Sequence, residues 1–284
     1  MKQELWDLHQ SIKKRAPLIH CLTNHISIND CANAVLEVGG RPIMAEHPLE
    51  VEGITASAKS LVVNMGNISD NRMKAIELSG RLAYEKGIPK IIDMVGLGCS
   101  PLRYEFAKEW IERCQPEIIK GNHSEIKALL GLAHDADGID VGEFDQLEEK
   151  NIQMGLDNAK RLSKRYGCVV LISGAIDIVV EEEKVYSIHN GHPIMAKVTG
   201  TGCMLNAVVG TYLASNKPLE SAVLGALVMG IAGEVAKNQS VGTGSFRVNL
   251  HDQLYNMTEQ VFLEMGRLGD GYEKFQSRTL LSHE

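Results

Sequence analysis

Residues 61–93 read LVVNMGNISDNRMKAIELSGRLAYEKGIPKIID, and the order of the patterns in this stretch indicates the fold class. Leu61–Asn64 and Lys90–Asp93 are short apolar runs of the length of buried strands, and a helical segment near Asp70–Lys86 separates them. A strand, a crossover helix and a second strand form the unit from which parallel sheets are built. The stretch therefore predicts an α/β protein.

The same alternation continues on both sides of this stretch. Further strands are expected near Arg41–Ala45, Glu117–Lys120, Cys168–Ser173 and Asp177–Glu181, and further helices near Ser27–Leu36, Leu102–Cys114, Ser124–Leu130 and Ile152–Arg165. From Cys203 to about Leu268 the pattern changes, and three helices without a strand are expected there. We therefore expect residues 1–284 to form one α/β domain, with a mostly parallel sheet and a helical C-terminal third.

The composition argues against several classes of partner. The formal net charge is −7, and no cluster of lysines and arginines is interleaved with aromatic residues, so we expect no binding to nucleic acid. The chain has no apolar run of about 18 residues, so we expect no membrane span. The amino terminus lacks the apolar stretch of a signal peptide, and the six cysteines form no CxxC pair. These features favour free thiols in a reducing compartment, and hence a cytoplasmic location.

Three polar turns that contain glycine follow three of the predicted strands directly. They are Asn64-Met65-Gly66-Asn67, Asp93-Met94-Val95-Gly96-Leu97-Gly98 and Lys120-Gly121-Asn122-His123-Ser124-Glu125. In open parallel sheets, ligands collect beyond the carboxyl ends of the strands. A ligand site is therefore expected at these turns.

A fourth turn, Val198-Thr199-Gly200-Thr201-Gly202-Cys203-Met204-Leu205, leads directly into an apolar helix. Free backbone N–H groups at a helix start, together with the positive end of the helix dipole, hold phosphate oxygens, and glycines let the backbone approach them closely. The alternative is a glycine-eased entry to a buried helix. The Walker pattern is missing, and so is the dinucleotide fingerprint, which needs Gly or Ala where Leu205 stands.

Several short motifs occur in a fixed order along nearly the whole chain. They are Pro17-Leu18-Ile19-His20-Cys21-Leu22-Thr23-Asn24, Asn29 with Ala32-Asn33, Pro42-Ile43-Met44-Ala45, Lys120 to Glu125, Val198 to Leu205, Gly230-Ile231-Ala232-Gly233-Glu234, and Gly244-Ser245-Phe246 with Leu254-Tyr255. In this order they resemble the hydroxyethylthiazole kinase family of thiamine salvage, within the ribokinase-like superfamily. The resemblance implies a ribokinase-like fold with helices on both faces of the sheet. It also implies phosphorylation of the hydroxyl of 4-methyl-5-(2-hydroxyethyl)thiazole by ATP with Mg²⁺, in a homotrimer with sites between subunits.

The resemblance assigns roles to the fourth turn. Gly200 matches a substrate contact, and Thr201 and Gly202 complete an anion hole. Cys203 stands where many ribokinase-like enzymes place an aspartate base and where this family commonly places cysteine. A thiol at a helix N-terminus can act as a base, but free cysteine also serves as a small buried hydrophobe. Phosphoryl transfer demands little deprotonation, so the base role of Cys203 stays open at this point.

Each of the remaining site residues has a functional and a structural interpretation. Met44 matches a substrate contact, although in isolation such a methionine more often belongs to the core. Asn24 and Cys21 resemble part of the thiazole site and could equally satisfy turn backbone. Asp93 and Glu125 are the carboxylates best placed for Mg²⁺. The alternatives are that Asp93 shapes its turn and that Glu125 closes a capping box with Asn122.

Two residues match ATP contacts with a change of residue type. Lys120 stands where the family usually has arginine. A lysine keeps the positive charge but lacks the bidentate hydrogen bonding of a guanidinium group. Ser173 stands where the family has threonine, and it keeps the hydroxyl. The run Asp93-Met94-Val95-Gly96 also departs from the usual Asp-Pro-Val-Gly, and Cys99-Ser100 replaces Ala-Thr.

Three alternative functions stay open. Another ribokinase-like vitamin kinase would act on hydroxymethylpyrimidine or pyridoxal, but such kinases usually carry aspartate at the position of Cys203. A thiazole-binding protein that has lost catalysis is the second alternative. A dinucleotide-dependent oxidoreductase is the third, and the missing fingerprint counts against it.

Overall fold

The computed structural model describes residues 1–132 and 149–270. Within these ranges the strands form a nine-stranded sheet in the order β2-β1-β3-β4-β5-β6-β7-β8-β9. Their bounds are β1 (Leu18–Leu22), β2 (Arg41–Ile43), β3 (Ser60–Asn64), β4 (Lys90–Asp93), β5 (Ile118–Gly121), β6 (Val169–Ile172), β7 (Asp177–Glu181), β8 (Lys184–Ile188) and β9 (Leu268–Asp270). The strands from β2 to β6 are parallel, whereas β6 to β9 pair antiparallel. The expected mostly parallel sheet is confirmed.

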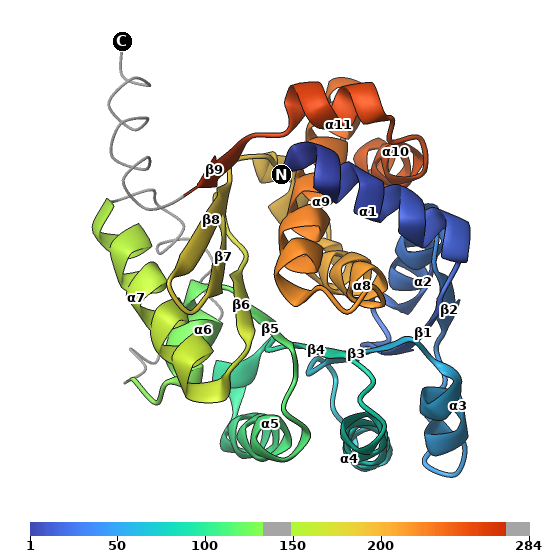
Figure 1. Cartoon of the computed structure of the whole chain (residues 1–284), viewed down its shortest axis with the longest axis vertical. Helices are drawn as coiled ribbons and strands as arrows, with labels where there is room; N and C mark the ends of the chain where they lie inside the picture. Colours follow the sequence, from blue (N-terminus) through green and yellow to red (C-terminus); the bar gives the residue numbers. More distant parts are fainter. Residues whose placement is uncertain (133–148, 271–284) are drawn as a thin grey trace.

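Helices cover both faces of this curved sheet (Figure 1). On one face lie α1 (Lys2–Arg15), α2 (Ile28–Glu37), α8 (Thr201–Leu213), α9 (Pro218–Asn238), α10 (Thr243–Tyr255) and α11 (Glu259–Met265). Of these, α2, α8 and α9 contact the strands, and α1, α10 and α11 pack on those helices. The other face packs against α3 (Val51–Ser57), α4 (Asp70–Glu85), α5 (Pro101–Cys114), α6 (His123–Leu129) and α7 (Glu149–Tyr166). Side chains alternate along a strand, so in β3 Val62 belongs to the first core, and Leu61 and Val63 belong to the second.

The C-terminal prediction was wrong in two details. Between residues 201 and 270, all of which the structure describes, four helices occur rather than three, and β9 adds a strand antiparallel to β8. The extra helix arises because Thr258 begins a new helix, with its side-chain oxygen accepting a hydrogen bond from Val261 N at 3.3 Å. β9 has only three residues, Leu268-Gly269-Asp270, and their sequence has no strand pattern. They form a strand because they pair with β8.

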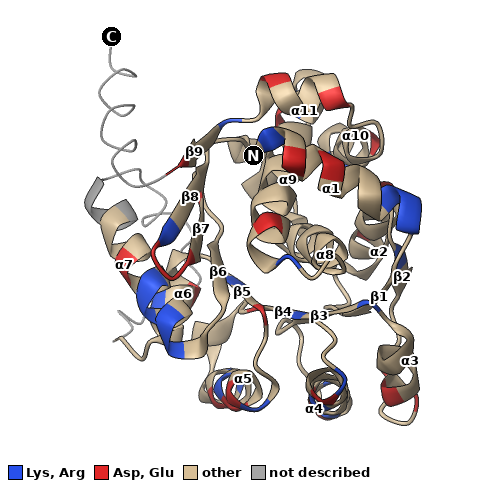
Figure 2. Ribbon diagram, in the orientation of Figure 1, with Lys and Arg blue, Asp and Glu red and all other residues tan. Residues whose placement is uncertain are grey.

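Helix α8 packs directly on β3 and β4, and this contact positions the site. A β-carbon on Gly210 would lie 2.2 Å from Val62 Cγ2, so only glycine allows the helix to approach the sheet this closely. Ser60 Oγ donates a hydrogen bond to the Gly210 carbonyl at 2.6 Å, and Asn206 Nδ2 donates one to the Val63 carbonyl at 3.0 Å. The helix carries no charged residue (Figure 2), as expected for an element enclosed by the core.

Helix α9 is the only helix of the described residues that is long and apolar enough to cross a membrane. Its most apolar window has a mean hydropathy of 1.6, but 83% of that window is buried inside the fold. The helix packs against α8 and α10 and is a core helix of this structure.

Candidate active site

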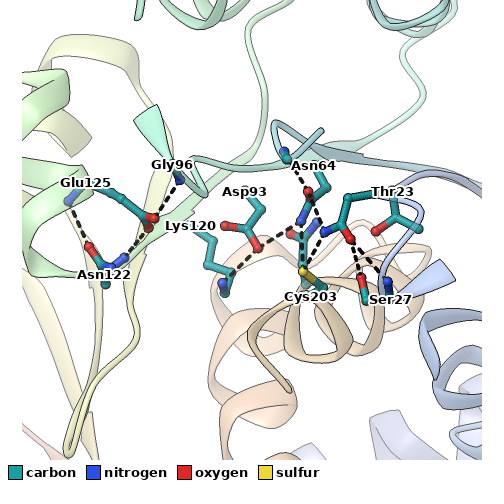
Figure 3. Close-up of polar contacts among 12 residues, drawn as sticks. Thr23, Ser27, Asn64, Asp93, Gly96, Lys120, Asn122, Glu125 and Cys203 are labelled. Carbon is teal, nitrogen blue, oxygen red and sulfur yellow. Dashed lines mark hydrogen bonds and ion pairs between the residues drawn. The ribbon is translucent and has the colours of Figure 1, made fainter. Parts of the chain in front are cut away.

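The strand register brings three polar side chains together at the carboxyl edge of the sheet. Asn64 at the end of β3 is paired with Asp93 at the end of β4, and Asp93 is paired with Lys120 in β5. All three are buried and point toward the N-terminus of α8, where Cys203 lies (Figure 3). The turns that the sequence singled out therefore converge, as expected for parallel strands.

Asp93 and Lys120 form a buried ion pair. Lys120 Nζ lies 2.9 Å from Asp93 Oδ2, and neither side chain is more than 4% exposed. Burial lowers the pKa of Lys120, but the carboxylates of Asp93 and Glu125 outweigh burial and raise the pKa overall, so the lysine is a cation. Burial raises the pKa of Asp93, and Lys120 and the backbone N–H of Val95 oppose that rise. The second oxygen, Asp93 Oδ1, is buried without a hydrogen-bond partner among the described residues.

Two asparagine amides hold the thiol of Cys203. Asn24 Nδ2 lies 3.0 Å from Cys203 Sγ and Asn64 Nδ2 lies 3.4 Å from it (Figure 3). The side-chain oxygen Asn24 Oδ1 accepts hydrogen bonds from the backbone N–H and the hydroxyl of Ser27, both at 3.1 Å, which turns the amide nitrogen toward the sulfur. Both amides therefore present an N–H donor to the same sulfur and fix its position.

The backbone of the turn before α8 can form a cradle for an anion. Gly200 has φ of 96°, which a side chain would strain, and a β-carbon there would lie 3.0 Å from Ser27 Cβ. Lys120 Nζ lies 3.6 Å from the position of a β-carbon on Gly202, so the buried cation faces the cradle. Thr201 Oγ1 donates to the Met195 carbonyl at 3.0 Å, and its hydroxyl thereby fixes the turn. The free donors of this turn are backbone N–H groups at the positive end of the helix dipole.

Glu125 closes the capping box of α6. Asn122 Oδ1 accepts from Glu125 N at 2.8 Å, and Glu125 Oε2 accepts from Asn122 N at 2.8 Å. Glu125 Oε1 accepts from Gly96 N at 3.0 Å, so this side chain also ties the turn after β4 to the start of α6 (Figure 3). Burial and the nearby Asp93 raise the pKa of Glu125.

The site offers few side chains that could bind a divalent cation, so such an ion would keep most of its ligands from water and phosphate. No group of three or more His, Cys, Asp or Glu side chains could hold a metal ion in residues 1–132 and 149–270. Magnesium keeps several waters and binds phosphate oxygens beside one or two carboxylates, so it needs no such group. The unpartnered Asp93 Oδ1 is an acceptor of the right chemistry for it.

The other predicted residues lie further from this centre. Ser173 follows β6, and its N–H donates to the Gly121 carbonyl at 2.9 Å, which places it beside the end of β5. Met44 follows β2 and packs against the core that includes α8. Cys21 lies within the same core at 2% exposure, and burial, followed by the nearby Cys31, raises the pKa of its thiol.

Two arginines that the sequence did not single out hold the turns in place. Arg72 of α4 donates from Nη1 to the carbonyl of Gly66 at 2.6 Å and from Nη2 to that of Asn64 at 3.0 Å. Arg103 of α5 donates from Nη1 to the Met65 carbonyl at 3.2 Å. In the sequence both look like ordinary surface arginines of a helix, but in the structure Arg72 is buried and Arg103 is half-buried.

The fold and this site together define a class of protein. The nine-stranded, mostly parallel sheet with helices on both faces is a ribokinase-like fold, and the glycine turn and the buried ion pair lie at the carboxyl edge of its strands. A ribokinase-like superfamily protein from Enterococcus faecalis aligns with a TM-score of 0.61 at 14% identity, covering 85% of this chain and 88% of that one, which shows the shared fold.

Closer comparisons show the family. The model described as "Hydroxyethylthiazole kinase family" matches residues 9–260. Hydroxyethylthiazole kinase 2 of Clostridium botulinum is 47% identical over 262 residues, covering 92% of this chain and 98% of that protein. The structure of a hydroxyethylthiazole kinase protein from Pyrococcus horikoshii aligns with a TM-score of 0.86 at 29% identity, covering 95% of this chain and 100% of that one. The chain belongs to the hydroxyethylthiazole kinase family, whose members are phosphotransferases.

Proposed function

We propose that this chain, as one domain of residues 1–284, transfers the γ-phosphoryl group of ATP to the primary hydroxyl of 4-methyl-5-(2-hydroxyethyl)thiazole. The products are the thiazole phosphate and ADP, and the reaction belongs to thiamine salvage. The observation that carries the proposal is the convergence of Asp93, Lys120 and Cys203 on the glycine turn that begins α8. This set of groups handles negative charge, and phosphoryl transfer is mainly alignment and charge neutralisation.

On the nucleotide side, the backbone of Gly200 to Gly202 binds phosphate oxygens and Lys120 supplies the cation beside them. Ser173, next to the end of β5, is the second ATP contact. Mg²⁺ bound at Asp93 Oδ1 would neutralise phosphate charge. Because Glu125 uses both oxygens on backbone N–H groups, we assign it an indirect role, through water on the metal.

On the acceptor side, Cys203 lies at the start of α8, where it would take the proton of the attacking hydroxyl, and two amide donors fix the position of its sulfur. Gly200, Asn24 and Met44 surround the thiazole, and Cys21 supports the wall from the core. The thiazole site is completed by a neighbouring subunit in a homotrimer, which light scattering at several protein concentrations would test. The free thiols of the described cysteines suit a cytoplasmic enzyme.

The test is ADP release with ATP and Mg²⁺ against a panel of thiazole, hydroxymethylpyrimidine and pyridoxine alcohols. We expect the highest kcat/KM with the hydroxyethyl thiazole. Turnover of a pyrimidine or pyridoxine alcohol in preference to the thiazole would contradict the assigned substrate. Thiazole binding without any ADP release would instead indicate a binding protein.

A further inference from the structure

A short irregular segment that carries the proposed thiazole contact is held from several sides. We call residues Met44, Ala45 and Glu46, which follow β2, the Met44 segment. All three are half-buried and belong to neither a helix nor a strand. Irregular surface segments are ordinarily the mobile parts of a protein. In this segment, side chains from three other parts of the chain fix two successive residues.

His20 of β1 holds the backbone of the segment. Its Nε2 lies 2.8 Å from the Ala45 carbonyl, and its Nδ1 lies 2.8 Å from Thr55 Oγ1. A carbonyl only accepts, so Nε2 carries the proton and Nδ1 accepts from the threonine hydroxyl. Burial lowers the pKa of His20, in keeping with this neutral form. His20 therefore acts as a fixed bridge between α3 and the Met44 segment.

Glu46 is held between an exposed histidine and a buried arginine. Its Oε1 accepts from His25 Nε2 at 2.9 Å, and its Oε2 lies 3.7 Å from Arg72 Nε. The Arg72 side chain is 1% exposed, and its Nε has no hydrogen-bond partner among the described residues. Glu46 is thus the counter-charge of a buried guanidinium. Burial lowers the pKa of Arg72, and Glu46 raises it again.

The other end of Arg72 binds the turn after β3. Its two terminal nitrogens donate to the carbonyls of Asn64, Gly66 and Asn67 at 3.0, 2.6 and 3.1 Å. Asn64 is also one of the two amides that hold Cys203. One buried side chain therefore connects the segment of the proposed thiazole contact to the turn that orients the proposed base. Burying a guanidinium is costly, so this connection is not an incidental surface pair.

We propose that Glu46, clamped between Arg72 and His25, is a positioning residue that sets the separation of Met44 and Cys203, so that the site selects acceptor alcohols by the length of their hydroxyalkyl chain. The inference rests on the proposed function, since it takes Met44 as the acceptor contact and Cys203 as the group next to the reacting hydroxyl. Small displacements of a bound reactant cost much of its reactivity, which is how a clamp of this kind acts on selectivity.

The experiment compares three variants of the full chain with hydroxyethyl and hydroxymethyl thiazoles. Glu46→Gln keeps the shape of the side chain and removes its charge, and Glu46→Asp keeps the charge and shortens the side chain. For Glu46→Gln we expect the KM of the hydroxyethyl thiazole to rise about 10-fold, and its preference over the shorter alcohol to narrow by a similar factor, with the KM of ATP unchanged. Glu46→Asp should lie between this variant and the wild type.

Glu52→Gln is the matched control, because it removes an exposed ion pair, Glu52 with Arg81 at 3.3 Å, outside the Met44 segment. We expect it to behave as the wild type. If Glu46→Gln kept the wild-type acceptor KM and length preference, or raised the KM values of ATP and acceptor alike, the inference would be wrong and the proposed function would stand. If the wild type turned over no thiazole alcohol, the proposed function would fail, and the inference with it.

Discussion

Cys203 is the residue whose surroundings are most specific to this site. It occupies the third position of α8, and one side chain from the loop after β1 and one from β3 donate hydrogen bonds to its sulfur. These donors, Asn24 and Asn64, suit any acceptor that bears negative charge, and a carboxylate is a stronger acceptor than a thiol. The surroundings of Cys203 therefore also suit an aspartate.

We predict that Cys203→Asp retains or raises kcat, because its carboxylate accepts the same two amide bonds and is a base at neutral pH. Cys203→Ala should lower kcat only severalfold, because a loose transition state needs little proton removal. Steady-state kinetics with saturating ATP measures both. Cys168→Ala, which changes a buried thiol of the other core, is the control. Complete loss of turnover in the aspartate variant would argue against the base role.

At the residue scale, the sequence singled out Asp93, Lys120 and Cys203 because the first two end predicted strands and Cys203 begins a predicted helix, and the structure brings the three together. It could not decide between the two roles of Glu125, since a capping box and a metal ligand need the same carboxylate at the same position. The structure shows the capping box. Arg72 was missed because its importance comes from burial against turns that lie elsewhere in the sequence.

At the scale of elements, the Asp93–Lys120 pair is a contact between neighbouring strands. The register of β4 with β5 sets the two side chains opposite each other on one face, and burial makes each dependent on the other. Removing one partner of such a pair leaves an uncompensated charge in the core.

We predict that Lys120→Met lowers the free energy of unfolding by about 3–5 kcal/mol, because it leaves the buried Asp93 carboxylate without its counter-charge. The double variant Lys120→Met with Asp93→Asn should regain most of this stability without regaining activity. Urea denaturation measures the first effect and ADP release the second. Lys74→Met, which breaks an exposed pair with Glu77, should cost less than about 1 kcal/mol. A double variant no more stable than Lys120→Met would show that the charge pair is not the cause.

Helices and strands with a strong local sequence pattern could be predicted, and those without one could not. The strands β3 to β6 are apolar runs between helices of ordinary length, and they were expected nearly at their observed bounds. β1 was not expected, because His20 interrupts its apolar run and finds its two partners only in the folded chain. β9 exists through its pairing with β8 and has no β-branched residue of its own.

At the scale of the whole molecule, α1 closes the face of the sheet that carries α8 (Figure 1). His9 of α1 makes this contact polar, with its Nδ1 2.8 Å from the Tyr212 hydroxyl in α8. Burial, with Lys13 as the second cause, lowers the pKa of His9 to about 3. The folded chain therefore keeps His9 neutral at a pH where the unfolded chain protonates it.

We predict that the free energy of unfolding falls as the pH is lowered from about 6.5 toward 3, since the unfolded state then binds more protons than the folded state. His9→Gln should flatten this part of the pH profile, measured by urea denaturation at a series of pH values. His47→Gln, a change at an exposed histidine, should leave it unaltered. An unchanged slope in His9→Gln would mean that other groups carry the pH dependence.

The central claim is that the site transfers the phosphoryl group of ATP to the hydroxyl of the thiazole and not to water. Phosphorus NMR of a reaction with ATP, Mg²⁺ and the hydroxyethyl thiazole tests it most directly, because it identifies the bond that forms. We predict a phosphate monoester signal, coupled to the neighbouring CH₂ protons, that grows in step with ADP. Inorganic phosphate growing in step with ADP, with no ester signal, would contradict the claim.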